Sequence, residues 1–150
     1  MRFSRHKNSL MAQRLGYLGL IPFVALAGLS FLVSSAHKPA VFFSLVAYGA
    51  TVVSFLGAIH WGLTMTENAP SKRQLVWGVL PSLLAWISLM VAVEFGLVLV
   101  AAVLFLCLVV DFKIYPNFGL DHWLPMRLHL TIVAILSNIL PVLFALPWFS

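Results

Sequence analysis

The sequence has very few charged residues. Asp, Glu, Lys and Arg make up 9% of its 150 residues, and only four of these are acidic. Apolar residues make up 62%, and the mean hydropathy is +1.04. A soluble chain of this size needs a polar surface, because large exposed apolar patches lead to association. The composition therefore excludes an ordinary soluble protein and predicts a single transmembrane domain over residues 1–150.

Cysteine is also scarce, since Cys107 is the only one. A disulfide framework and a thiolate metal site are therefore excluded, and Cys107 is expected to be a small core residue within its apolar run. The sequence contains no phosphate loop, helical His-Glu-x-x-His motif or Ser/His/Asp nucleophile motif. We therefore predict no catalytic residue, no metal site and no enzymatic activity.

Five long apolar stretches predict five transmembrane helices. A helix needs about 20 apolar residues to cross a hydrocarbon core of about 30 Å. The stretches cover roughly residues 15–33, 41–65, 75–91, 95–110 and 128–146. The third and fourth are nearly continuous, and Glu94 beside Gly96 is the expected turn between them. The expected fold class is an all-α integral membrane protein.

The basic residues predict the orientation of these helices. Lys38 falls alone on one side of the membrane. The other side carries Arg2, Arg5, Lys7, Arg14, Lys72, Arg73, Lys113 and Arg127. The positive-inside rule then places the N-terminus and an interfacial loop over 111–125 in the cytoplasm, and the C-terminus outside. The net charge of +5 thus favours contact with anionic lipid head groups rather than with nucleic acid.

The N-terminal segment allows two other interpretations. A basic start, an apolar run and Ser34-Ser35-Ala36 resemble a cleavable signal peptide, but the run over 15–33 is longer than the usual core of about 7–15 residues. An acid-free, Arg-containing start also resembles a mitochondrial presequence, although it is very short. We expect a retained helix in a bacterial inner membrane, with the mitochondrial inner membrane as the alternative.

The second stretch carries a face of small residues. They are Gly49, Ala50, Ser54, Gly57, Ala58 and Gly62. Small side chains let helices approach closely, which is how membrane helices pack without a hydrophobic driving force. His60 lies on the same face at 100° per residue, so it is expected to face protein rather than lipid.

Several polar residues are expected at one depth near the cytoplasmic side. They are His60, Trp61, Asp111, Asp121, His122, Arg127 and His129. The predicted pairs are Arg127 with Asp111 or Asp121, and His60 with Asp111 or His129. Ionisable groups at such depths are candidate ligand-binding residues. Each also has a structural interpretation, as a topology anchor, a helix cap or an interhelical hydrogen bond.

Specific cofactors receive little support from the sequence. Facing His60 and His129 at equal depth would suit a bis-histidine haem. His60, Asp111 and His129 would supply three zinc ligands, but no local spacing motif accompanies them. We predict no cofactor, with haem or a quinone as open alternatives.

Three segments together resemble a known family. They are Leu15-Gly-Tyr-Leu-Gly-Leu-Ile-Pro22, Tyr48-Gly-Ala-Thr-Val-Val-Ser-Phe-Leu-Gly-Ala-Ile-His-Trp-Gly62 and Trp123-Leu-Pro-Met-Arg-Leu-His-Leu-Thr131, and the part of the second segment from Ser54 is the most specific. The chain resembles small multipass membrane proteins with a domain of unknown function, found in proteobacterial inner membranes and in a mitochondrial transmembrane protein. The likeness runs from Leu15 to about Leu140. It implies a location and a fold, but no reaction or ligand.

Two functional hypotheses follow. The first is an accessory or assembly protein of a membrane complex, or a self-associating bundle, that packs through its small-residue face. The second is a protein that binds or transports a small solute, a proton or a lipophilic cofactor at the polar cluster. Pumps usually place carboxylates near the membrane midplane, and none is expected there, which favours the first hypothesis.

Overall fold

The computed structural model describes residues 2–66 and 71–145, with side chains from residue 10 onward. This part of the chain is helical and contains no strand. Its α-helices are α1 (Arg2–Leu18), α2 (Ile21–Leu32), α3 (Lys38–Thr64), α4 (Lys72–Ser88), α5 (Val93–Ile114) and α6 (Leu124–Ala145). Two 3-10 helices, η1 (Tyr115–Phe118) and η2 (Asp121–Trp123), join α5 to α6. The side chains of Arg2, Arg5 and Lys7 and the predicted last helical residue, Leu146, lie outside the described part.

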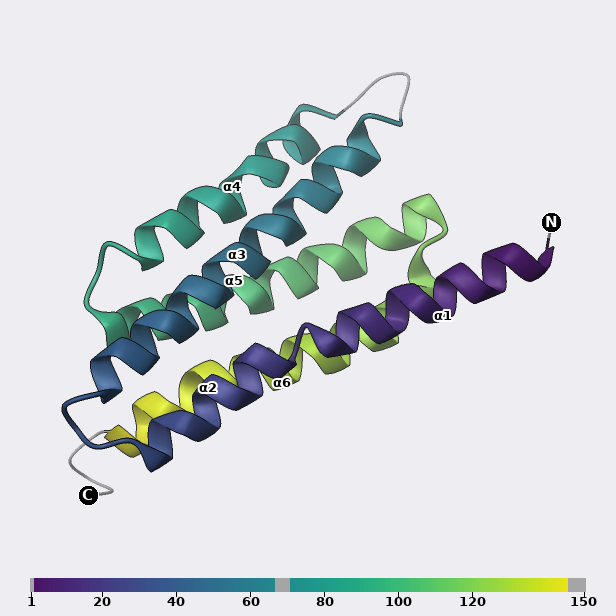
Figure 1. Ribbon diagram of the computed structural model, residues 1–150. Helices are drawn as coiled ribbons and strands as arrows, with labels where there is room; N and C mark the ends of the chain where they lie inside the picture. Colours follow the sequence, from purple (N-terminus) through teal and green to yellow (C-terminus); the bar gives the residue numbers. More distant parts are fainter. Residues whose placement is uncertain (1, 67–70, 146–150) are drawn as a thin grey trace.

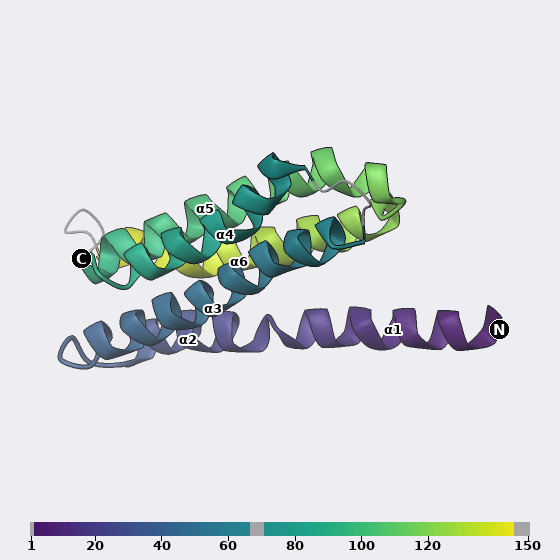
Figure 2. The same ribbon diagram turned by 90° about the horizontal axis from the view of Figure 1, so that it is seen from above.

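The helices form an elongated bundle in which, after α2, each helix runs in the opposite direction to the one before it in the chain (Figure 1). α1 and α2 follow one another almost in line, and α1 extends past the other helices (Figure 2). α3 packs against α2, α4 and α5, while α6 packs against α2 and α5. The start of α1 and the end of α6 lie at opposite ends of the bundle in Figure 1. The starts of α4 and α6 and the end of α5 lie at the same end as the start of α1.

Four helical stretches in the described residues are long and apolar enough to cross a membrane. They are Leu10–Leu32, Lys38–Thr64, Val93–Phe118 and Asp121–Ala145. α4 is shorter, with 17 residues, and begins with two basic residues, Lys72 and Arg73. The chain is therefore an all-α membrane protein with four such stretches, and α4 corresponds to the third predicted helix.

The first predicted helix is longer than expected and is interrupted. Helical structure begins at Arg2, not near Leu15, and breaks at Gly19 and Leu20. Pro22 lacks the N–H that would continue the helical hydrogen-bond ladder. Beside this break, the Gly19 carbonyl oxygen accepts a hydrogen bond of 2.7 Å from the Tyr48 hydroxyl group on α3.

The predicted loop over 111–125 is wrong at both ends. α5 continues through Asp111 to Ile114, and α6 begins at Leu124. Hydropathy locates the apolar part of a helix, but backbone hydrogen bonding continues into charged residues beyond it. The turn between α4 and α5 does lie where Glu94 predicts, because this exposed residue occupies the first turn of α5. A carboxylate is favourable at a helix N-terminus.

The apolar core lies mainly between α3 and α5. Leu45, Val53 and Leu97 are fully buried there, and Cys107 is 1% exposed, which confirms its expected place in the core. Gly49 allows this packing, because a Cβ atom added to it would lie 2.5 Å from Cγ1 of Val100.

The small-residue face of α3 is only partly used in packing. Gly49, Ala50 and Gly57 are buried and Ser54 is partly buried, whereas Ala58 and Gly62 are exposed on the bundle surface. A Cβ atom added to Gly57 would lie 2.6 Å from the carbonyl oxygen of Gly78 on α4, but one added to Gly62 would meet nothing within 4 Å. Each four-residue step turns by about 40° on a helix, so the face rotates away from its neighbours.

Candidate functional site

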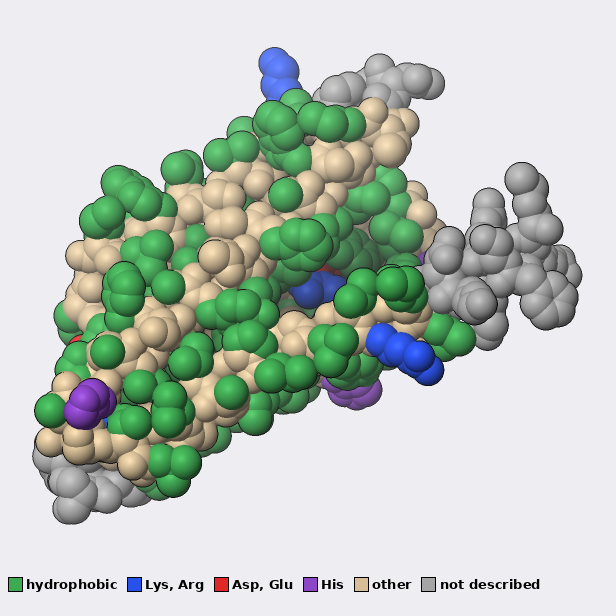
Figure 3. Space-filling model, in the orientation of Figure 1, with side chains coloured by type: hydrophobic (Ala, Val, Ile, Leu, Met, Phe, Trp, Pro, Cys, Tyr) green, Lys and Arg blue, Asp and Glu red, His purple; other side chains and the backbone are tan. Residues whose placement is uncertain are grey.

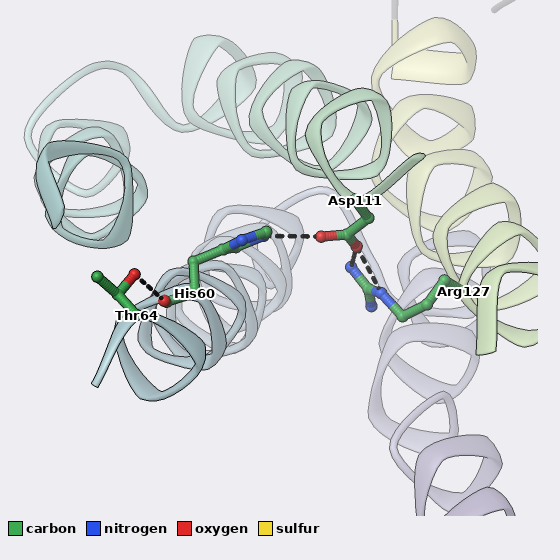
Figure 4. A network of polar contacts seen from close by, with 4 residues as sticks. All are labelled: His60, Thr64, Asp111 and Arg127. Carbon is green, nitrogen blue, oxygen red and sulfur yellow. Dashed lines mark hydrogen bonds and ion pairs between the residues drawn. The ribbon is translucent and has the colours of Figure 1, made fainter. Parts of the chain in front are cut away.

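Three polar side chains from three helices meet near one end of the bundle (Figure 4). His60 comes from α3, Asp111 from the end of α5 and Arg127 from the start of α6. Nε2 of His60 lies 2.8 Å from Oδ1 of Asp111. Nε of Arg127 donates a hydrogen bond of 2.7 Å to Oδ2 of Asp111. Nη2 of Arg127 lies 2.7 Å from the same oxygen but is not directed toward it for a hydrogen bond.

These three residues form the polar triad. Their side chains are largely shielded from solvent, so each needs polar partners that the other members supply. The side chains of His60 and Asp111 are 1% and 2% exposed, and that of Arg127 is 11% exposed. A buried carboxylate is costly unless it is paired and hydrogen-bonded. Asp111 meets this requirement because both of its oxygens have a partner. The triad thus fixes the positions of α3, α5 and α6 relative to one another.

The two ring nitrogens of His60 have different surroundings. Nε2 donates to the Asp111 carboxylate, whereas the buried Nδ1 has no hydrogen-bond partner among the described protein groups. The Asp111 carboxylate and the Arg127 guanidinium group form an ion pair whose charges compensate each other.

Neighbouring groups fix the position of the imidazole ring. Thr64 donates a hydrogen bond of 2.8 Å to the backbone carbonyl of His60. The ring of Trp77 on α4 lies 6.4 Å from the His60 ring in an edge-to-face arrangement. The ring of Tyr115, at the start of η1, lies 6.0 Å away. Tyr115 is buried, so η1 folds back over the triad rather than extending away from the bundle.

Arg127 also lines an apolar groove between α1, α2, α3 and α6. A wider cavity of about 520 Å³ lies beside η1 and η2, and a narrower one of about 240 Å³ continues along α6. Both cavities are lined by Leu15, Gly16, Phe55, Leu56, Arg127 and Leu130. The space-filling view shows the hollow, with cationic side-chain atoms at its base (Figure 3). Neither His60 nor Asp111 lines either cavity.

Four predicted site residues lie outside the triad. Asp121, His122 and His129 are exposed. Trp61 is 40% exposed, and its Nε1 donates a hydrogen bond of 2.9 Å to the carbonyl oxygen of Leu75.

The pairs of Arg127 with Asp111 and of His60 with Asp111 are confirmed, whereas the alternatives with Asp121 and His129 are wrong. Residues two apart on a helix point about 200° apart, which explains why His129 faces away from Arg127.

The geometry also contradicts the two metal arrangements considered from the sequence. His129 is exposed and His60 is bonded to Asp111, so these histidines do not face each other across a haem site. Within residues 2–66 and 71–145, no group of three or more His, Cys, Asp or Glu side chains is placed to hold a metal ion. The zinc set of His60, Asp111 and His129 is therefore not assembled.

A polar line along α6 was missed by the sequence analysis. Thr131 and Asn138 are buried on the side of α6 that carries Arg127. Nδ2 of Asn138 donates a hydrogen bond of 2.7 Å to the carbonyl oxygen of Ala134, but the Thr131 hydroxyl group has no partner among the described groups. The spacing of Arg127, Thr131 and Asn138 at i, i+4 and i+11 places all three within a narrow arc, and this signal could have found the line.

Comparisons with known proteins agree with the membrane fold. The chain is 39% identical over 129 residues to "Transmembrane protein 69" of Xenopus tropicalis, covering 82% of this chain and 50% of the relative. It is 26% identical over 129 residues to "Transmembrane protein 69" of Mus musculus, covering 83% and 52%. The chain thus spans about half the length of these curated relatives. No solved structure matches the chain.

A family profile described as "Protein of unknown function (DUF3429)" matches residues 9–143. This match covers nearly the whole helical bundle, including all three members of the triad. The resemblance inferred from the three sequence segments is confirmed. The chain therefore belongs to the DUF3429 family of multipass membrane proteins of unknown function.

Proposed function

We propose that this chain is a non-catalytic protein of the bacterial inner membrane that binds a lipophilic molecule beside Arg127. One observation carries the proposal: a buried carboxylate holds a guanidinium group at the wall of a mainly apolar groove. Such a groove offers an amphiphile both a surface for its tail and a hydrogen-bond donor for its head. The alternative location for this chain is the mitochondrial inner membrane, where the proposed site would be the same.

The proposed topology has five spans, with the N-terminus in the cytoplasm and the C-terminus outside. α4 packs against α3 and α5, and its 17 residues reach about 26 Å at 1.5 Å per residue. Lys72 and Arg73 at its start can extend toward the interface, which offsets the short length. Lys113 and Arg127 share that end of the bundle, whereas Lys38 begins α3 at the opposite end. The positive-inside rule assigns the first end to the cytoplasm.

The arrangement of the guanidinium group supports binding. Placing Arg within a membrane domain is costly, and such residues usually face a bundle interior or mark a ligand site. Nε is taken by Asp111, and a further guanidinium nitrogen points away from Asp111, on the side of the pale purple ribbon of α1 and α2 (Figure 4). This leaves donors that a ligand head group can use.

Binding rather than catalysis is proposed because the triad keeps its reactive groups engaged. Both Asp111 oxygens are hydrogen-bonded, and the Nε2 atom of His60 is directed at Asp111 rather than into the groove. A general base must lie within hydrogen-bond reach of its substrate, and neither residue lines the cavities. No resident metal or haem forms part of the proposal.

The proposal is tested by purifying the protein from native membranes in mild detergent and extracting its bound lipophilic molecules for mass spectrometry. We expect the native chain to retain one compound in roughly equal molar amount, and Arg127→Ala to lose it. Arg14→Ala is the matched control, because Arg14 is exposed on α1. Equal retention by the native chain and the Arg127→Ala variant, or no retention by either, would contradict the proposal.

A second candidate, an accessory protein of a membrane complex, is favoured by the uncovered part of the α3 face. Ala58 and Gly62 are exposed, and Gly62 leaves room for a neighbouring helix. Gly62→Leu should then abolish co-purification of a partner protein, or self-association, while the bound lipophilic compound is kept. An unchanged set of co-purifying proteins would exclude this role.

A further inference from the structure

We infer that the occupant of the groove is a lipid-soluble quinone, bound with one ring carbonyl at Arg127 and its opposite side near Thr131. This inference rests on the proposed function and names the class of ligand. Three features of the groove carry it: the charge of the triad, the aromatic walls of the wider cavity and the spacing of two polar side chains on α6.

The charge of the triad favours a neutral ligand. The Asp111 carboxylate and the Arg127 guanidinium group compensate each other, so the ion pair at the wall of the groove has no net charge to offer an anion. A carboxylate or phosphate head would introduce an uncompensated charge into a groove with apolar walls. The guanidinium group has only donors, so the ligand must provide an acceptor. A neutral carbonyl oxygen meets both conditions.

Aromatic side chains define the wider cavity. Phe55 of α3, Tyr115 of η1 and Trp123 of η2 line it together with Arg127. Aromatic rings pack well against other flat rings in stacked or edge-on arrangements. The volume of about 520 Å³ lies within the range of about 300–1,000 Å³ usual for sites that bind small organic molecules. These walls suit a flat ring better than a branched glycerol ester.

Thr131 supplies the second polar contact. It lines the narrower cavity with Arg127, is 2% exposed, and its hydroxyl oxygen has no hydrogen-bond partner. An unpartnered buried hydroxyl group is costly, so a ligand oxygen there would be stabilising. Arg127 and Thr131 are four residues apart on α6, so their side chains lie on the same side of the helix about one turn apart. Both line the narrower cavity, where one ligand can contact both groups.

The narrower cavity provides a path for an apolar tail. Phe23, Leu104 and Ala134 line it, and it continues from the Arg127 end along α6. Its other hydroxyl group, on Tyr48, is already bonded to the carbonyl oxygen of Gly19. The apolar walls therefore suit a hydrocarbon chain attached to the ring, which places the ring where the two cavities meet at Arg127 and the tail toward the bundle centre.

The test measures binding of a short-tailed benzoquinone to the full chain in lipid nanodiscs by equilibrium partitioning. Three competitors are compared: a fatty acid, a fatty alcohol of the same length, and phosphatidylglycerol. We expect saturable quinone binding that none of the three displaces. Thr131→Val and Arg127→Lys should each weaken it by about tenfold, which corresponds to the loss of one hydrogen bond of about 1.4 kcal/mol. Phe55→Leu should weaken it by about threefold through lost ring contact.

Matched variants separate the groove from general effects on the fold. Thr51→Val removes a hydroxyl group that bonds only to the backbone carbonyl of Tyr48, and Phe43→Leu changes an exposed ring at the far end of α3. Both should bind the quinone as the native chain does. Phe55 is 65% exposed, so Phe55→Leu is expected to fold. It therefore still tests the site if a variant at a buried position fails to fold.

The possible failures are distinguishable. If any of the three competitors displaces the quinone, or binds in its place with the same dependence on Arg127, the quinone inference is wrong and lipophile binding stands. If no compound binds saturably and the native preparation retains nothing, both the inference and the proposed function are wrong. Equal quinone affinity in Thr131→Val and the native chain would overturn the assigned ring position.

Discussion

The two ends of the bundle are held together by different means. At the end where α3 begins, the helices pack through apolar side chains such as Leu45 and Leu97 and through the close approach at Gly49. At the other end, a buried polar triad joins α3, α5 and α6, and a groove opens beside it. The first end needs only complementary shape. The second contains buried charges that a purely structural role does not require, because well-packed apolar residues often replace a buried ion pair at no loss of stability.

The largest effect is expected from breaking the triad at its centre. Asp111→Ala would leave the Arg127 guanidinium group buried without its anion, which costs about 3–5 kcal/mol in free energy of unfolding. Unfolding in mixed micelles of increasing SDS content would measure this loss. Asp121→Ala is the control, because Asp121 is exposed. Equal midpoints for the two variants would show that the triad does not stabilise this end.

The next effect concerns the contact between α3 and α4. Gly57→Val should lower the free energy of unfolding by about 1–3 kcal/mol, because the added side chain meets the backbone of α4 and forces the helices apart. The same SDS titration applies. Gly62→Val adds the same atoms where no neighbour lies within 4 Å, so it should change stability little. If Gly62→Val lowered the free energy of unfolding more than Gly57→Val, the close contact between α3 and α4 would not lie at Gly57.

A smaller effect is expected at the junction of α1 and α2. Tyr48→Phe removes the hydrogen bond to the Gly19 carbonyl oxygen, at a cost of about 0.6–1 kcal/mol. Hydrogen exchange of the amides from Gly19 to Val24 should become faster, with little change in α5. Tyr17→Phe provides the control because Tyr17 is exposed on α1. Unchanged exchange in Tyr48→Phe would mean that another group satisfies the carbonyl.

The smallest change in stability is expected when the whole triad becomes apolar. His60→Leu, Asp111→Leu and Arg127→Leu together remove both charges, so the free energy of unfolding should stay within about 1 kcal/mol of the native value. Binding in the groove should nevertheless be lost, as measured by extraction and mass spectrometry. Retained binding would show that the charges serve only the fold.

Much of the architecture could be predicted from hydropathy and charge. The turn near Glu94, the core position of Cys107 and the pairing of Asp111 with Arg127 follow from where apolar runs stop and where opposite charges come to one depth. Such features depend on the hydropathy and charge of short segments and on the fact that consecutive membrane helices alternate in direction. Helix ends were less accurate, because α1 and the last turn of α5 continue through polar residues that hydropathy does not detect.

The rest depends on rotation and on contacts between distant segments. Ala58 and Gly62 share the spacing of Ala50, but the slow rotation of a four-residue repeat carries them away from α4 and α5. His129 lies two residues from Arg127 and therefore on the opposite side of α6. The groove lies between α1, α2, α3 and α6 and borders the η1–η2 segment, so no single stretch of sequence contains it.

The most direct test of the account places a photoreactive phenylalanine analogue at position 55 in native membranes and identifies its adducts by mass spectrometry. Position 43, on the same helix but outside both cavities, is the reference. We predict one dominant small lipophilic adduct at position 55, absent in the Arg127→Ala background, and mixed phospholipid adducts at position 43. The same phospholipid mixture at both positions, unaffected by Arg127→Ala, would contradict the claim that the triad holds Arg127 for a ligand.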